Sequence, residues 1–206
     1  LLTINGPNAG KAGSDSRRLP EAVLKNSKII ISGTSTVTID GFHIYRTDKE
    51  QDTVYISSPS AEATIKNSII ERNGPDSSGR GITMVGNAKA VISNNLFTGN
   101  DDGGLFGGNK AWYSAIYSNG GTSANVQITN NVFTNNRTAI NLDNYSSGVV
   151  LSGNIFDNNG THLSFGGSTA LSGSFTLGEN EFGRLGDAII NLSNVNPDFR
   201  LDISDS

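Results

Sequence analysis

Residues 128–136 read ITNNVFTNN, and a shortened form of this stretch recurs along the chain. The shared pattern is an apolar residue, two variable residues, a polar residue that is usually Asn, one variable residue, and then an aromatic residue or Ile. The copies begin at Ile39 (a degenerate copy), Ile65, Ile92, Ile128, Leu151 and Leu177. These leading residues are 26, 27, 36, 23 and 26 positions apart. Repeat intervals of this size predict an array of stacked units.

Each unit has the period of a β-strand. Apolar and polar residues alternate in Val126-Gln127-Ile128-Thr129, which indicates a strand with one buried face. A second short apolar stretch follows in each unit, such as Ile140-Asn141-Leu142, and no segment between them has helical periodicity. Stacked units whose like strands pair in parallel would satisfy both backbone and side chains. The sequence therefore predicts an all-β, single-stranded parallel β-helix (solenoid) of about seven to eight coils.

Two Asn columns and one Phe column emerge when the units are aligned. Asn donates and accepts hydrogen bonds, so amides stacked one coil apart can form internal ladders along the axis. We predict such ladders for both Asn columns and core stacking for the Phe column. The first Asn column is Asn95, Asn131, Asn154 and Asn180, with Ser68 in the same register; the second is Asn73, Asn100, Asn136 and Asn159; the Phe column is Phe97, Phe133, Phe156 and Phe182.

The residues just before the aromatic position form an apolar stripe of Ile69, Leu96, Val132 and Ile155. Strict alternation would point this stripe outward as a lateral contact surface. The alternative, which we favour at this stage, is that the preceding turn swings these side chains into the core.

The motif quoted above resembles the repeat of the right-handed parallel β-helix family, the pectin-lyase-like superfamily. The resemblance covers nearly the whole chain and implies a right-handed coil. The segments LLTINGPNAG and VTIDGFHI also resemble parts of large secreted bacterial surface proteins. The resemblance implies little about activity, because lyases, hydrolases, epimerases, phage tailspikes and adhesins share this scaffold.

Composition narrows the classes of function. The net charge is −4 and the pI is about 5.1, which argues against nucleic acid or an anionic membrane as the partner. No apolar run approaches the length that spans a bilayer, so we expect no membrane insertion. The absence of Cys excludes disulfides and Cys-bound metals and is compatible with secretion from bacteria.

The chain shows no internal linker, so we predict a single domain over residues 1–206. It opens on the strand-like Leu1-Leu2-Thr3-Ile4 without a polar cap, whereas repeat arrays need capping units. We therefore expect a piece of a longer protein with neighbouring domains.

Three consecutive units contain long connections between the aromatic position and the next strand. Ile44 to Val54 advances ten residues, Ile70 to Ile82 twelve, and Phe97 to Ile116 nineteen. Later units advance only seven, as from Phe133 to Ile140. Because the insertions share one register, we predict that they form longer loops on one flank, which is where repeat proteins often bind ligands.

We expect this flank to contact a polysaccharide or cell-surface glycan. An aromatic ring can stack on the apolar face of a sugar while polar groups bind its hydroxyls. The candidate binding residues are Arg80, Trp112, Tyr113, Arg137 and His162. The structural alternatives, which we favour, are that Trp112 covers its own loop and that His162 is a surface residue in a tight turn.

A catalytic interpretation of the flank uses Asp76, Asp101, Asp102 and Lys110. Two carboxylates could hydrolyse a glycosidic bond, or Lys110, Tyr113 or His162 could remove a proton beside a uronate neutralised by Arg80 or Arg137. We favour the alternative that Asp101 and Asp102 are solvated turn residues, because two further polygalacturonase signatures of the superfamily, Gly-His-Gly and Arg-Ile-Lys, are missing.

We expect no cofactor and no dedicated metal site. Carboxylate and amide oxygens such as those of Asp101, Asp102, Asp143 and Asn144 could still hold Ca²⁺, although no known calcium-loop motif is present.

The sequence thus favours a non-catalytic, secreted or cell-surface bacterial module, either an adhesin or a rigid spacer, with glycan on the long-loop flank. The alternative is a polysaccharide lyase, epimerase or glycoside hydrolase that uses the same flank.

Overall fold

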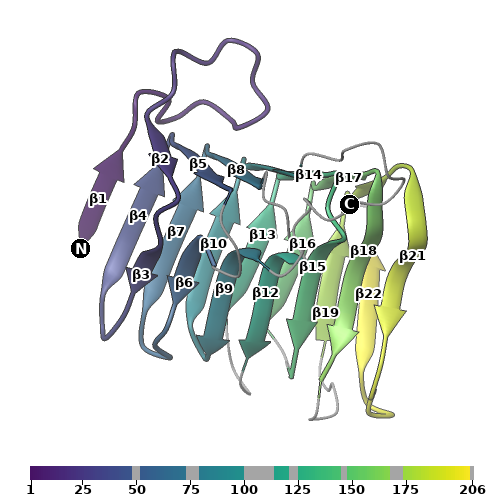
Figure 1. The fold of residues 1–206 in the computed structure, drawn as a ribbon. Helices are drawn as coiled ribbons and strands as arrows, with labels where there is room; N and C mark the ends of the chain where they lie inside the picture. The colour runs from purple at the N-terminus through teal and green to yellow at the C-terminus, as the bar shows by residue number, and fades with distance from the viewer. Residues whose placement is uncertain are drawn as a thin grey trace.

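The computed structural model describes residues 1–47, 52–72, 79–99, 114–120, 125–144, 148–167 and 174–204. These residues form 22 strands in three parallel sheets, here called A, B and C, which wrap around one apolar core (Figure 1). Within these ranges no helix is long and apolar enough to cross a bilayer. The predicted all-β parallel solenoid is confirmed.

Sheet A is the eight-stranded stack that carries the first half of each repeat motif. Its strands pair in parallel with like residues in register, so that Ile65 lies beside Ile39 on one side and Ile92 on the other. Its strands in spatial order are β1 (Leu2–Asn5), β4 (Thr36–Asp40), β7 (Glu62–Lys66), β10 (Lys89–Ser93), β13 (Val126–Thr129), β16 (Val149–Ser152), β19 (Ser174–Gly178) and β22 (Arg200–Ser204).

Sheet B carries the aromatic end of the motif. The rings of Phe97 and Phe133 stack with centroids 4.8 Å apart, and Phe133 and Phe156 follow at 5.0 Å, so the Phe column packs in the core as predicted. Its seven strands are β2 (Val23–Lys25), β5 (His43–Arg46), β8 (Ile69–Arg72), β11 (Leu96–Gly99), β14 (Val132–Thr134), β17 (Ile155–Asp157) and β20 (Glu181–Phe182).

Sheet C is built from the second apolar stretch of each unit. Ile82, Ile116 and Ile140 lie in register and are fully buried. Its seven strands are β3 (Ile29–Ile31), β6 (Val54–Ile56), β9 (Arg80–Gly86), β12 (Ser114–Gly120), β15 (Thr138–Asp143), β18 (Asn159–Gly166) and β21 (Leu185–Leu192).

The A–B corner, where the chain turns from sheet A into sheet B, holds the first Asn ladder. The backbone N–H of Asn95 donates to Oδ1 of Asn131 at 2.9 Å, and the N–H of Asn131 donates to Oδ1 of Asn154 at 3.0 Å. The side-chain amide of Asn131 also donates to the carbonyl of Ile92. Asn95, Asn131 and Asn154 are at most 1% exposed, so the ladder satisfies backbone groups that water cannot reach.

The residue before each ladder position bends the chain sharply. Asn67, Asn94 and Asn130 adopt φ values between 54° and 57°, in the left-handed region that Asn tolerates better than most residues. Gly41 and Gly153 occupy the same position in other coils, with φ of 81° and 65°. Each A–B corner between paired strands from β4 to β20 is therefore a two-residue turn.

The second predicted Asn ladder exists where it can be observed, at the B–C corner between sheets B and C. The side chain of Asn136 donates to Oδ1 of Asn159 at 2.9 Å, and both residues are fully buried. Asn73 and Asn100 lie outside the described residues.

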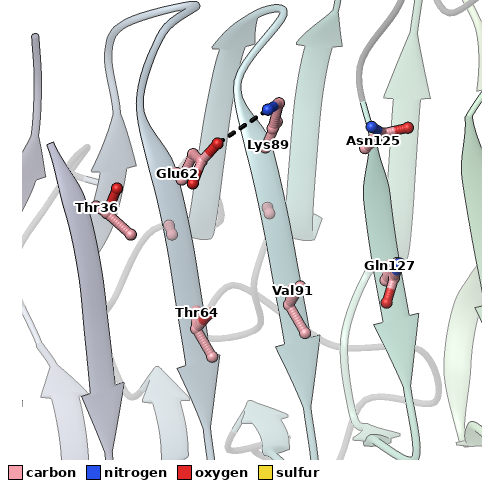
Figure 2. Close-up of a pocket in the computed structure, with 9 residues that line it drawn as sticks. Thr36, Glu62, Thr64, Lys89, Val91, Asn125 and Gln127 are labelled. Atoms are coloured by element: carbon pink, nitrogen blue, oxygen red, sulfur yellow. Dashed lines mark hydrogen bonds and ion pairs between the residues drawn. The ribbon is translucent and has the colours of Figure 1, made fainter. Parts of the chain in front are cut away.

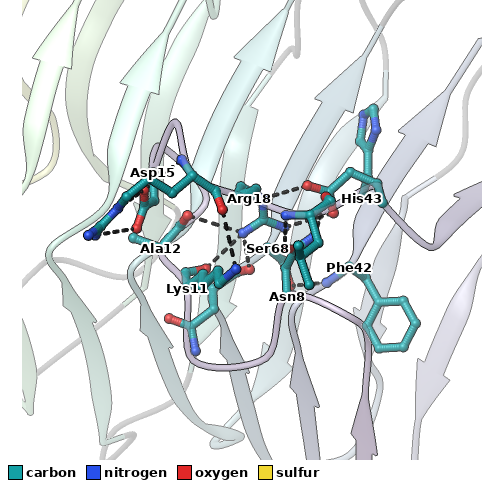
Figure 3. A network of polar contacts seen from close by, with 12 residues as sticks. Asn8, Lys11, Ala12, Asp15, Arg18, Phe42, His43 and Ser68 are labelled. Carbon is teal, nitrogen blue, oxygen red and sulfur yellow. Dashed lines mark hydrogen bonds and ion pairs between the residues drawn. The ribbon is translucent and has the colours of Figure 1, made fainter.

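The first coil replaces the tight A–B corner with a longer segment, residues 6–22, that lies over the corners of the following coils (Figure 3). The N–H of Gly13 donates to the carbonyl of Asn94 at 2.7 Å. Nη1 of Arg18 donates to the carbonyls of Lys11, Ala12 and Asn67, while its other nitrogens contact Glu21. Arg18 therefore ties this segment of the first coil to the corner of the third coil, between β7 and β8.

The stripe of Ile69, Leu96, Val132 and Ile155 does not turn into the core, contrary to our expectation. Strict alternation holds along sheet B, so these residues are only partly buried while their next neighbours are fully buried. Ile155 is 40% exposed. The corner consumes two residues and leaves the pleat of the strand intact, so the stripe lies on the outer face of sheet B.

Candidate functional site

The three long connections leave the solenoid side by side at the B–C corner. Arg46, Arg72 and Gly99 end their strands in register, and the strands that follow in sheet C are also paired. The strand ends that flank the three insertions therefore share one register, as predicted. Most of their residues, including the candidates Asp76, Asp101, Asp102, Lys110, Trp112 and Tyr113, lie outside the described residues, so their roles stay predictions.

Two arginines lie buried at the base of this flank. Arg46 and Arg72 are neighbours on paired strands and are 2% and 0% exposed. Arg46 donates to the carbonyls of Ser27 and Asp52, and the backbone at Gly79 packs directly against the Arg72 guanidinium. Two guanidinium groups one strand apart give this base a positive character in an otherwise acidic chain.

Arg80 is the one predicted binding residue that the structure places in a described polar cluster. Its guanidinium carbon lies 3.7 Å from the centre of the Tyr117 ring. Tyr117 in turn hydrogen-bonds Asp143 on the next strand. Burial raises the pKa of the Asp143 carboxyl above its ordinary value, although the bond from Tyr117 and the charge of Arg80 act in the opposite direction.

Tyr117 is flanked on the outer face of sheet C by Thr83 and Asn141, its partners on the two adjacent strands. Three buried polar atoms in this cluster, Nε of Arg80, Oγ1 of Thr83 and Oδ1 of Asn141, have no hydrogen-bond partner among the described residues. Buried polar atoms in native proteins are nearly always satisfied, so these three point to a bound polar molecule or water. We call Arg80, Thr83, Tyr117, Asn141 and Asp143 the Tyr117 cluster.

The same outward column continues along the sheet with residues of similar chemistry. Tyr55 precedes Thr83 in register, and the ammonium of Lys28 lies 4.4 Å from its ring centre. Ser164 and Asn191 follow Asn141. The outer face of sheet C therefore presents a line of aromatic, hydroxyl and amide side chains at the strand spacing of about 4.8 Å.

The structure does not bring Arg137 or His162 against Arg80. Strand β12 lies between β9, which begins at Arg80, and β15, which begins one residue after Arg137. Arg137 is exposed at its corner.

The surface position expected for His162 is wrong. His162 is fully buried, with its ring 5.7 Å and 5.9 Å from the rings of Phe156 and Phe182, and its Nδ1 lies 3.3 Å from Nδ2 of Asn159. Burial lowers its pKa below 6.5, against the opposing effects of the Gly183 backbone and Asp157. The ring extends the Phe column, so His162 serves the core.

A shallow hollow of about 210 Å³ lies on the outer face of sheet A (Figure 2). Glu62 and Lys89 form a 2.9 Å ion pair across neighbouring strands, and Thr64, Val91 and Gln127 line the next row. Lys89 holds the pKa of Glu62 below its ordinary value. The polar groups of this pair satisfy one another, so the hollow lacks the orphaned atoms that distinguish the Tyr117 cluster.

Sequence reasoning missed Tyr117, Thr83 and Asn141 as site residues and weighed Asp143 only as a calcium ligand. The available signal was their position between inward residues, as Thr83 lies between Ile82 and Met84 and Asn141 between Ile140 and Leu142. In the described ranges, no group of three or more Asp, Glu or His side chains is arranged to hold a metal ion.

The comparisons with known proteins agree with this architecture. Residues 13–113 match the family described as "Right handed beta helix region". No curated protein and no solved structure matches the chain significantly. The paired strands continue in the same register beyond residue 113, through β22. The family match over residues 13–113 and the parallel solenoid that continues beyond it identify the chain as a right-handed β-helix.

Proposed function

We propose that this β-helix is a non-catalytic module that binds a polysaccharide on the outer face of sheet C. The observation that carries the proposal is the set of buried, unpaired polar atoms around Tyr117: Nε of Arg80, Oγ1 of Thr83 and Oδ1 of Asn141. Because these atoms have almost no solvent exposure, a ligand would reach them only where the side chains around Tyr117 move aside, and its donors and acceptors would then satisfy them.

Carbohydrate fits this chemistry better than other polymers. Sugar hydroxyls both donate and accept, which suits a hydroxyl, an amide oxygen and a guanidinium N–H within one cluster. Tyr117 offers an amphipathic ring at the same place. Arg80 adds a planar fork of donors that matches a carboxylate, so an acidic polysaccharide containing uronate is favoured over a neutral one.

The proposal extends to where the protein acts, which is outside the bacterial cell or on its surface. A rigid, Cys-free β-helix and the resemblance to bacterial surface repeats support a secreted or cell-surface bacterial protein. In that setting the chain would act as an adhesin or rigid spacer joined to neighbouring domains, with the predicted residues Trp112 and Tyr113 contributing from the long connections beside sheet C.

A second candidate, a polysaccharide lyase or epimerase, is favoured by one observation. Asp143 is a carboxyl whose pKa burial raises, and it lies in the same cluster as the Tyr117 hydroxyl and Arg80. Groups with shifted pKa values beside a cation are suited to proton transfer next to a uronate carboxylate.

The test is a binding and turnover screen on polygalacturonate, alginate, xylan and galactan, with and without Ca²⁺. We expect the wild type to bind at least one acidic polymer and Tyr117→Ala to weaken that binding about tenfold or more. Gln127→Ala, on the outer face of sheet A, is the matched control and should bind like the wild type.

The outcomes separate the two candidates. Binding without new products supports the module, whereas unsaturated or epimerised products that disappear in Asp143→Asn support the enzyme. If Asp101→Ala or Asp102→Ala abolishes turnover, the mutated residue has the catalytic role predicted from the sequence. If no polymer binds, or if Tyr117→Ala binds as well as the wild type, the proposed site is wrong.

A further inference from the structure

The Tyr117 cluster contains a carboxyl group of its own beside the cation that we assign to the ligand. Asp143 is the last residue of β15, and its carboxyl is hydrogen-bonded to Tyr117 on the neighbouring strand β12. Arg80 lies over the ring of the same tyrosine, with its guanidinium carbon 3.7 Å from the ring centre, and its charge acts on the Asp143 carboxyl. Tyr117 therefore contacts both an internal acid and the guanidinium.

Asp143 offers Arg80 the same chemical group as a uronate does. A uronate carboxylate bound to the planar fork of Arg80 would lie close to the Asp143 carboxylate. The two negative charges would repel each other, and the partly buried position of Asp143 leaves that repulsion only partly screened by water. The carboxylate of the ligand and that of the protein therefore compete for one cation.

The surroundings of Asp143 are simple on the strands beside it. In register, Asn119 of β12 lies on one side and Gly166 of β18 on the other, and neither carries a charge. Of the residues that the structure describes, Arg80 and Tyr117 are the titratable groups that act on the Asp143 carboxyl. The effect of its charge on the site is therefore exerted through these two side chains.

Burial shifts the pH at which this carboxyl ionises. It raises the pKa of Asp143 above its ordinary value of 3.8, while the hydrogen bond from Tyr117 and the charge of Arg80 act in the opposite direction. Asp143 therefore takes up a proton at a higher pH than an exposed aspartate does. The protonated carboxyl is neutral, so it neither repels a uronate nor holds Arg80 as an ion.

We propose that Asp143 is a built-in competitor of an acidic ligand, which holds Arg80 while it is ionised and releases Arg80 when it is protonated. The site then binds a uronate chain more tightly in mildly acidic surroundings than at neutral pH. Linkage makes the effect reciprocal, so a bound uronate favours the proton on Asp143 and binding takes up a proton. This inference rests on the proposed function and specifies how that site is regulated.

The test is isothermal titration calorimetry of the 206-residue chain with polygalacturonate and with alginate, from about pH 7 down to about pH 4.5. We expect the dissociation constant to fall about fivefold or more over this range for the polymer that binds. The same titration in buffers of different protonation enthalpy should show net uptake of a proton on binding.

Asp143→Asn keeps the size of the side chain and its ability to accept a hydrogen bond, but removes the charge. At pH 7 this variant should bind about fivefold or more tighter than the wild type, with no proton uptake and little further change as the pH falls. Glu62→Gln is the matched control, because it neutralises a carboxylate that pairs with Lys89 on the outer face of sheet A. It should keep the pH dependence of the wild type. Circular dichroism of both variants verifies that they are folded.

The outcomes distinguish this inference from the proposed function. Equal affinity at both ends of the pH range without proton uptake would overturn the inference and leave the binding site in place. An Asp143→Asn variant that binds no better than the wild type at pH 7 would do the same. Absence of binding to both acidic polymers at every pH would overturn the inference together with the proposed preference for uronate.

Discussion

The two corners that bound sheet B are built differently. The A–B corner is a two-residue turn in every coil from β4 to β20, with a residue of positive φ followed by the ladder position. The B–C corner ranges from the single residue Asn158 to residues 100–113. The A–B corner keeps its length along a ladder that runs without a break from Ser68 to Asn180, whereas the described ladder of the B–C corner joins only Asn136 and Asn159.

The difference separates stability from function along the same strand. Each ladder Asn accepts from one coil and donates to another, so altering one corner disturbs its neighbours on both sides. The variable corner opens instead onto sheet C, where the Tyr117 cluster lies. The four predictions below compare these two sides.

The largest expected effect comes from inserting Gly-Ser-Gly-Ser between Asn130 and Asn131 in the A–B corner. The insertion separates the left-handed residue from the ladder residue and breaks bonds to two coils, so we expect a loss of more than about 4 kcal/mol. The same insertion between Gly103 and Gly104 in the longest B–C connection should change stability by about 1 kcal/mol or less, because closure entropy grows slowly with loop length. Urea unfolding of both proteins measures the contrast, and equal losses would refute it.

Removing one ladder side chain should have a smaller but still large effect. Asn131→Ala leaves the N–H of Asn95 and the carbonyl of Ile92 buried without their partner, which should cost roughly 2–5 kcal/mol. The control is Asn135→Ala at the B–C corner, where φ is 58° and the side chain is half-buried. We expect it to lose about 1 kcal/mol. A control that is as damaging as Asn131→Ala would mean that the ladder is not the main source of stability.

His162 should make an intermediate contribution to stability, and this contribution should depend on pH. Because burial lowers its folded-state pKa, the unfolded chain takes up a proton below about pH 6.5 when the native protein does not. Its contribution to stability is therefore lost as pH falls through that value. The melting temperature of the wild type should drop more between about pH 7 and about pH 5 than that of His162→Gln. Parallel curves for the two proteins would show that this histidine is not buried and neutral.

The smallest effect is expected for the ion pair on the outer face of sheet A. Glu62 and Lys89 are about half exposed, so solvent screens their attraction. Lys89→Ala should leave the melting temperature unchanged while the pKa of Glu62 returns toward its ordinary value, as followed by NMR titration. A clear fall in melting temperature would mean that this face also contributes to the scaffold.

The scaffold could be predicted from sequence because its determinants repeat. The spacing of Asn95, Asn131 and Asn154 set the ladder, and alternation along each unit set the buried columns. Each repeat reports the same constraint several times, so a local ambiguity in one coil is resolved by the others. This is why the degenerate first copy at Ile39 aligns with the later copies, and its pairing with Ile65 confirms that alignment.

The errors fall on residues that break the repeat. His162 has no equivalent in other coils, and sequence gave no sign that its ring would extend the Phe column behind Phe156 and Phe182. The stripe containing Ile155 was expected to be turned inward by the preceding corner, but the two-residue corner leaves the pleat intact and the stripe faces outward.

The candidate site was only partly predictable for a related reason. Arg80, Tyr117 and Asp143 come from three different coils and share no motif, so only the register brings them together. Sequence reasoning found the flank from the lengths of its connections. It could not find the orphaned atoms of Thr83 and Asn141, which depend on burial in the folded chain.

The most direct test of the central claim is hydrogen–deuterium exchange of the wild-type chain with and without each polymer of the screen. The claim is that the face beside the variable corner binds ligand while the uniform corner holds the fold. It predicts that a bound polymer slows exchange in β9, β12 and β15 and leaves the A–B corners unchanged. Protection confined to the A–B corners or sheet A, or no protection with any polymer, would contradict it.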